Sequence, residues 1–279
     1  MSYRFQAGRQ YLMPTHFGPM SGPRARPDGG RYPVPDSRIR ESYALTFLTD
    51  RAALEALLPE GFELFGDPSV TVTFSYMTNI DWLAGRGYNM LGVSVPARIR
   101  RKDDWLVAPF LLVLWENLAD PIITGREQLG FNKIYCELPD PQRTGSGIGC
   151  EAIWLGHRFA SLDIDSLAPA EPAKAAALPP EHVAASLLHL RYFPRIGQLD
   201  VAAVSEAVVS PAASAAGRVL DTRRGVGRLA FHPTRWEDMP TQAHIVEGLR
   251  ALPIRETQSV LYQKVSGGPD HLGQALVNA

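Results

Sequence analysis

From residue 43 onward, apolar and polar positions alternate with a period of two, which is typical of half-buried β-strands. A short helix is predicted in RAALEALLP (51–59), which follows the N-cap pair Thr49 and Asp50 and ends in proline. A second is predicted in IITGREQLG (122–130), which has Pro121 at its first position and ends in glycine. The strands predicted here are YALTFLT (43–49), VTVTFSYM (70–77), LGVSVPARIR (91–100), LVAPFLLVLW (106–115) and FNKIYCEL (131–138).

The second half of the chain continues this pattern. GSGIG (145–149) is expected to be a hairpin turn rather than a phosphate loop, because neither a helix nor a Lys-Ser/Thr pair follows it. PTQAHIVEGLRAL (240–252) is helical, 168–182 is a loop or short helix, and 267–279 is a frayed tail. The strands expected here are CEAIWLG (150–156), HRFASLDI (157–164), LLHLRYFPR (187–195), DVAAVSEAVVS (200–210), GVGRLAFHP (225–233) and QSVLYQKV (258–265). Many strands joined by short turns, with few helices, indicate a largely antiparallel α+β domain.

Residues 1–36 are rich in Gly, Pro and Arg and show no sustained period. They predict an arm outside the domain, which spans 37–266. The arm is either loosely structured or crosses a neighbouring subunit, since it offers apolar anchors at Tyr11, Leu12, Met13, Phe17 and Tyr32.

Composition excludes several classes of protein. The 279 residues are 45% hydrophobic and 20% charged with a formal net charge of −1, so nucleic acid and anionic membranes are not expected partners. No apolar run is long enough for a membrane span, and MSYRFQAGRQ lacks a signal peptide's apolar segment, so a cytoplasmic protein is expected. The two cysteines form no CxxC, and the histidines show no HxH or HExxH spacing. We therefore expect neither a metal nor another cofactor.

Lys133 is the strongest candidate for chemistry. It is one of four lysines in an arginine-rich chain and lies among Phe131, Ile134 and Tyr135. Such a lysine either extends its ammonium group to solvent or is kept as a nucleophile. A nucleophilic amine must be neutral, which requires its pKa of about 10.4 to fall through apolar burial or a nearby cation such as Arg126. The neutral amine can condense with a ketone or 2-oxo acid to form an iminium.

GREQLGFNK (125–133) resembles the signature of the acetoacetate decarboxylase superfamily, in which GRE precedes a Tyr/Phe-Pro-Lys-Lys segment. RESYALTFLTD (40–50) resembles the family's Arg-Glu-Tyr strand, and 224–265 resembles its closing region. The resemblance covers about 37–266. It implies a single domain with a β-barrel or cone-like sheet and a few flanking helices, and assembly into a homo-oligomer.

The resemblance assigns Lys133 as the Schiff-base lysine and Arg40 as the partner of the substrate carboxylate. Departures from the family pattern concern the residues around them. Ile134 replaces the family's second lysine and Asn132 its proline, while the family's two glutamates fall at Ser75 and Met90.

These departures favour a lyase that performs aldol, retro-aldol or dehydration chemistry on pyruvate or a related 2-oxo acid. Decarboxylation of acetoacetate or another 3-oxo acid is the alternative, and a non-catalytic protein that binds a small carboxylate is a third possibility. Lys133→Ala separates the last from the enzymes, because only a binding protein would keep its ligand.

Other candidate side chains rest on weaker signals. Gln128, Tyr88 and Tyr262 are candidate proton-transfer groups beside Lys133, although for each tyrosine core packing with a hydrogen-bonded hydroxyl is the favoured alternative. Glu127 is expected to be structural, and Glu116 is a possible buried carboxylate supported only by its apolar neighbours. The candidate substrate-binding residues are Arg40, Ser75, Tyr76, Met90 and Phe131.

Overall fold

A computed structural model describes residues 3–20, 26–28, 30, 32–33, 37–145, 147–171, 178–210, 217–268 and 273–278. Over these residues the chain is mostly β and has three α-helices, α1 (Arg51–Glu55), α2 (Ala119–Leu129) and α3 (Ala243–Arg250), with 3₁₀ turns at Thr15–Phe17 and Asp81–Leu83. The strands are β1 (Ile39–Leu48), β2 (Phe62–Leu64), β3 (Ser69–Thr78), β4 (Tyr88–Arg101), β5 (Asp104–Glu116), β6 (Lys133–Tyr135), β7 (Gln142–Thr144), β8 (Gly147–Trp154), β9 (His157–Pro169), β10 (His182–Ala184), β11 (Leu187–Arg195), β12 (Gln198–Ser210), β13 (Arg218–Phe231), β14 (Glu256–Ser266) and β15 (Ala275–Leu276).

All of these described strands belong to one sheet with the order β15-β12-β11-β5-β4-β3-β1-β14-β13-β9-β8-β7, while β6 and β10 pair with β5 and β2 pairs with β4. Pairing is antiparallel except where β5 meets β6, β10 and β11. The predicted largely antiparallel sheet is therefore confirmed. The predicted barrel is not closed: among the described strands, β15 and β7 are the two edges of the sheet and do not pair with each other.

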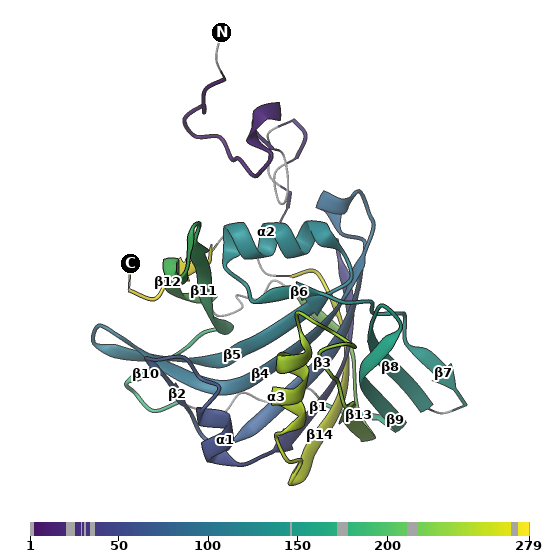
Figure 1. Ribbon diagram of the computed structural model, residues 1–279. Helices are drawn as coiled ribbons and strands as arrows, with labels where there is room; N and C mark the ends of the chain where they lie inside the picture. The colour runs from purple at the N-terminus through teal and green to yellow at the C-terminus, as the bar shows by residue number, and fades with distance from the viewer. Residues whose placement is uncertain are drawn as a thin grey trace.

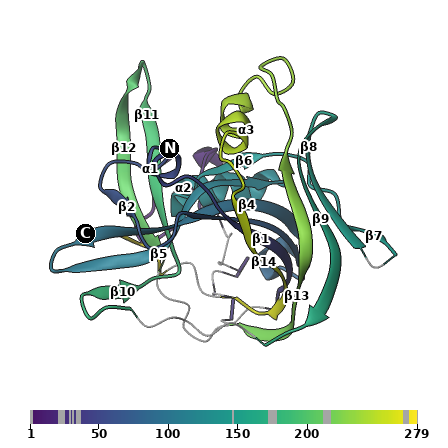
Figure 2. The same ribbon diagram turned by 90° about the horizontal axis from the view of Figure 1, so that it is seen from below.

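The two faces of the central strands differ in chemistry. One face carries the hydrophobic core, for example Tyr43, Phe74 and Trp115, and packs against Val246 and Leu249 of α3. The opposite face carries a mixture of polar and apolar side chains, for example Thr73, Ser75 and Met90. Helix α2 lies beside this face, next to β6 (Figure 1). Seen from below, the β11–β12 hairpin and strands β8 and β9 stand on either side of α3 (Figure 2). We call the face of the sheet opposite the hydrophobic core the α2 face.

A hydrogen-bonded link ties α3 to the strands beneath α2. The Trp115 indole N–H donates to Gln242 Oε1 (2.7 Å), and Gln242 Nε2 donates to the Tyr135 carbonyl (3.0 Å). Because both side chains are buried, this link satisfies polar groups that would otherwise be costly to bury. It joins the end of β5 to β6, where Lys133 lies.

Several predicted boundaries differ from the structure. Helix α2 begins at Ala119, two residues before Pro121, and Asp50 makes an ion pair with Arg255 (2.9 Å) instead of capping α1 with its side chain. The predicted frayed tail contains β15, which pairs with β12 because Val277 is buried beside it. Residue 146 of the predicted turn and 172–177 of the predicted loop lie outside the described residues.

The described part of the predicted N-terminal arm, residues 3–20, makes hydrogen bonds within itself, for example from the Met20 amide to the Gln10 carbonyl (3.1 Å). Tyr3, Phe5 and Tyr11 pack edge to face against one another, and the arm extends beyond α2 (Figure 1). Met13 and Phe17 are 73% and 89% exposed. No helix in the described ranges is long and apolar enough to cross a membrane.

Candidate active site

Lys133 lies at the junction of α2 and β6. Gly130 ends α2 with a left-handed conformation (φ 75°), which is accessible to glycine at little cost, and turns the chain toward the sheet. The Phe131 amide then donates to the Gly125 carbonyl (3.0 Å), and β6 starts at Lys133. The turn therefore directs the lysine side chain back beneath the helix, where the residue is only 6% exposed.

The Lys133 ammonium group contacts the Glu116 carboxylate and the Pro121 carbonyl. Nζ is 2.9 Å from Glu116 Oε1 and donates to the Pro121 carbonyl at 3.0 Å. Glu116 is fully buried, and no described residue donates a hydrogen bond to its Oε2. A Cβ atom at Gly125 would lie 2.6 Å from Lys133 Nζ, so the absence of a side chain there makes room for the amine.

Burial and charge act against each other at Glu116. Burial raises the pKa of the Glu116 carboxyl, and Lys133 opposes this increase through its positive charge and hydrogen bond. A buried carboxyl with a raised pKa accepts a proton more readily than an exposed one. The pair can thus exchange a proton over a short distance.

Strand pairing brings several predicted residues to the face that carries this pair. Ser75 of β3 is opposite Met90 of β4, which is opposite Glu116 of β5, and all three therefore lie in one row. Arg40 of β1 is opposite Met77, and Met77 is opposite Tyr88, two positions along the strands from this row. Side chains two residues apart share a face, so Arg40, Ser75, Tyr88 and Met90 all lie on the α2 face.

Three other candidates lie elsewhere. Tyr76 and Tyr262 both contact the Tyr43 ring on the core face, and the Tyr262 hydroxyl donates to Glu41 Oε2 (3.2 Å). Burial raises the pKa of both hydroxyls, and Glu41 contributes at Tyr262. Gln128 is exposed on α2, with Nε2 3.7 Å from the Met20 sulfur of the N-terminal arm. The sheet therefore separates Tyr76 and Tyr262 from the amine.

Phe131 is buried and separates Lys133 from a histidine. Its ring stacks on His189 (4.5 Å between centroids) and lies 5.3 Å from Lys133 Nζ. His189 Nε2 is 3.0 Å from the Leu129 carbonyl, which can only accept, so Nε2 carries the proton. Burial is the main reason that the pKa of His189 falls to about 4, and Lys133 adds to the decrease. The ring is consequently neutral near pH 7.

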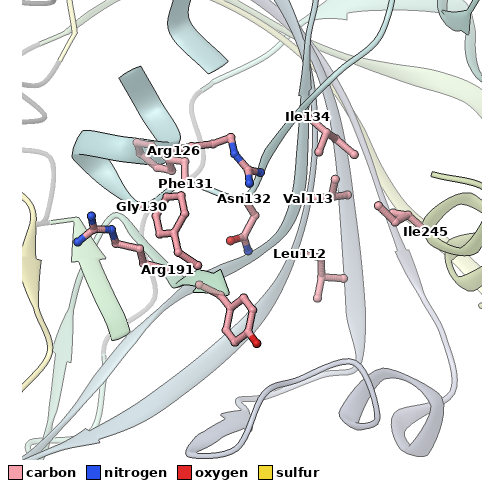
Figure 3. A pocket seen from close by; sticks show the side chains of 11 residues that line it. Leu112, Val113, Arg126, Gly130, Phe131, Asn132, Ile134, Arg191 and Ile245 are labelled. Carbon is pink, nitrogen blue, oxygen red and sulfur yellow. The ribbon is translucent and has the colours of Figure 1, made fainter. Parts of the chain in front are cut away.

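A pocket of about 240 Å³ lies on the side of β6 that faces away from the Lys133 amine (Figure 3). Asn132 and Ile134 line it, whereas Lys133 does not, as expected for alternate positions of a strand. Ile134, at the position where the resemblance expects the family's second lysine, therefore faces away from the Lys133 amine. Asn132 donates through Nδ2 to the Leu111 carbonyl (2.9 Å), so it has a structural contact at the position of the family's proline.

The sequence did not predict that Glu116 and His189 lie near the Lys133 amine. Glu116 reaches Lys133 because β5 and β6 pair in parallel, with Leu114 opposite Lys133. The only sequence signal was a carboxylate at the end of an apolar run. His189 comes from β11, more than fifty positions after Lys133, and nothing in its local sequence indicated the contact with Phe131. The part of the chain that is described contains no group of three His, Cys, Asp or Glu side chains able to hold a metal.

Gly125→Ala is expected to displace the Lys133 amine. The added Cβ would approach Nζ, Cε and Cδ to 2.6 Å, so either the lysine or α2 must move, at a cost of about 1–3 kcal/mol. Urea unfolding measures this cost. Gly248→Ala in α3 is the matched control, because its Cβ would contact nothing within 4 Å, and the stability of this variant should be unchanged or higher. Equal effects of the two substitutions would contradict the packing described above.

The architecture is similar to those of solved acetoacetate decarboxylases. An acetoacetate decarboxylase from Legionella pneumophila superposes with a TM-score of 0.62 at 17% identity, covering 99% of this chain and 98% of the other. Another acetoacetate decarboxylase superposes with a TM-score of 0.66 at 15% identity, covering 88% of this chain and 90% of the other. The enduracididine biosynthesis enzyme MppR, solved with pyruvate and with a condensation product of pyruvate and imidazole 4-carboxaldehyde, gives 0.60 and 0.59 at 16% identity, with 90–91% of this chain and 94–95% of the other covered.

The family model of acetoacetate decarboxylase (ADC) matches residues 13–267. The chain therefore belongs to the acetoacetate decarboxylase family, as its sequence suggested. No protein of curated function matches it in a sequence search.

Proposed function

We propose that this protein is a Schiff-base-forming lyase that uses Lys133 to activate a small 2-oxo acid such as pyruvate. The observation that carries this proposal is the buried amine, held 2.9 Å from a buried carboxylate and beneath a glycine that leaves room for it. A lysine that served only solubility would extend to solvent. A buried amine with an adjacent proton acceptor suits nucleophilic attack on a carbonyl.

Aldol or dehydration chemistry is favoured over decarboxylation by the composition of the α2 face. Ser75 and Met90 are neutral, and the carboxylate in their row, Glu116, is engaged by the amine. An enamine formed from a 2-oxo acid needs proton transfer but no group that destabilises a departing carboxylate. The fold likeness to MppR, which was solved with pyruvate and a pyruvate-derived condensation product, supports the same choice.

Borohydride trapping tests the proposal. The protein is incubated separately with pyruvate and acetoacetate, reduced, weighed intact and digested to locate the label. We expect the reduced pyruvate adduct on Lys133. An acetone-derived adduct from acetoacetate would instead indicate decarboxylation. If folded protein forms no adduct with either compound, the proposed function is wrong, and a binding protein becomes the better hypothesis.

Arg40 is proposed to bind the substrate carboxylate. It lies exposed on the α2 face, and the described residues include no carboxylate paired with it. Arg40→Gln should raise the pyruvate concentration needed for half-maximal trapping by roughly tenfold to a hundredfold, because the substrate carboxylate would lose one charge-assisted hydrogen bond. Arg51→Gln, which removes a surface cation on α1, is the control. An unchanged pyruvate dependence in Arg40→Gln would exclude this role.

A further inference from the structure

Imine formation at Lys133 requires a group that moves protons, and among the described residues the titratable side chains of Glu116 and His189 lie near the amine. Glu116 is in direct contact with Nζ at 2.9 Å. His189 is separated from it by the Phe131 ring, and its Nε2 proton is directed at the Leu129 carbonyl. With its pKa near 4, His189 is also a weak base at neutral pH. The direct contact with the amine therefore favours Glu116.

We propose that Glu116 is the catalytic acid and base of imine formation: it takes a proton from the Lys133 ammonium and later returns it to the hydroxyl that leaves as water. This inference rests on the function proposed above and assigns a role within it. The neighbouring strands supply no competitor in the same row, since Ser75 and Met90 do not titrate in this range.

The proton transfers balance over the reaction. Glu116 first accepts a proton from the ammonium, leaving a neutral amine. The nitrogen lone pair then forms a bond to the carbonyl carbon, the C–O π pair moves to oxygen, and one N–H proton passes to that oxygen, which gives a carbinolamine. Glu116 protonates its hydroxyl, the C–O bond breaks and water leaves. The nitrogen lone pair forms the C=N bond, which leaves a cationic iminium on Lys133 beside the Glu116 side chain, again in its carboxylate form.

Among the described residues, the Glu116 carboxylate has the ion pair with Lys133 as its one charged contact. No described residue donates to Oε2, so the carboxyl is not fixed in its ionised form by further hydrogen bonds. Burial raises the pKa of this carboxyl, which brings the neutral acid within reach during the reaction. A carboxylate stabilised by several donors would bind its proton too weakly to serve as the acid.

Glu116→Gln tests the role because it keeps the size of the side chain but cannot accept the proton. Imine formed from pyruvate is reduced with borohydride at successive times, and the labelled fraction is measured by intact mass. We expect the rate at saturating pyruvate to fall by about 10²–10⁴-fold, the usual contribution of general acid–base catalysis. The label should still map to Lys133. Glu63→Gln, at an ion pair between β2 and β4, is the matched control.

The outcomes separate the two proposals. If the wild-type protein is labelled and Glu116→Gln reacts within about threefold of its rate, Glu116 is not the acid–base group, although the lysine chemistry stands. If the wild-type protein is never labelled, the proposed function fails and this role fails with it. Should Glu116→Gln not fold, Glu116→Ala with added formate decides the matter. Saturable acceleration by formate supports the role, and a rate independent of formate overturns it.

Discussion

Lys133→Met is expected to abolish both adduct formation and turnover. Methionine fills a similar apolar volume but has no amine, so no covalent intermediate can form. Intact mass after borohydride treatment with pyruvate should show unmodified protein, and turnover should fall to the background rate. Lys102→Met, at a surface turn, is the control and should be labelled on Lys133 like the wild type. Persistent labelling of Lys133→Met at another site would contradict the assignment of the nucleophile.

The same substitution should lower stability by about 3–5 kcal/mol near neutral pH, because it leaves the buried Glu116 carboxylate without its cation. The double variant Lys133→Met/Glu116→Leu should recover most of this loss, since two apolar side chains can replace a buried ion pair at little cost. Urea unfolding of the two single variants and the double variant measures the coupling. Additive losses would show that the two residues do not depend on each other for stability.

The strands were predictable because their burial alternates. Residues 43–49 and 70–77 show a period-two pattern of apolar and polar positions, which predicts a strand at each. The structure has β1 and β3 at these positions. β6 has three residues and β15 has two, too few for a periodic signal. These short strands are held by pairing with β5 and β12 rather than by a pattern of their own.

The candidate site was predictable where a motif fixed the spacing and uncertain where distant strands met. The GREQLGFNK segment located Lys133, because Gly130 ends α2 at the helix-to-strand turn and Gly125 leaves room for the amine beneath the helix. Ser75 and Tyr76 were both candidates, yet adjacent residues of a strand point to opposite faces, and the structure places Tyr76 on the core face. The contact between Glu116 and Lys133 depends on parallel pairing of β5 with β6, which no local pattern specifies.

His189 should make the protein less stable as the pH falls from about 6.5 towards 4. Its pKa is about 4 in the folded protein and about 6.5 in the unfolded chain. Between these values the unfolded chain binds a proton that the native protein does not, so the free energy of unfolding decreases as protons are added. This histidine alone should contribute about 2 kcal/mol of lost stability between pH 7.5 and pH 5.

Comparison with His189→Gln isolates that contribution, because glutamine can still donate to the Leu129 carbonyl but does not titrate. Urea unfolding at the two pH values should show a smaller loss for His189→Gln than for the wild type, by about 2 kcal/mol. His244→Gln, at an exposed position of α3, should behave like the wild type. If His189→Gln loses as much stability as the wild type, the imidazole is protonated in the native protein, and burial beside Phe131 does not keep it neutral.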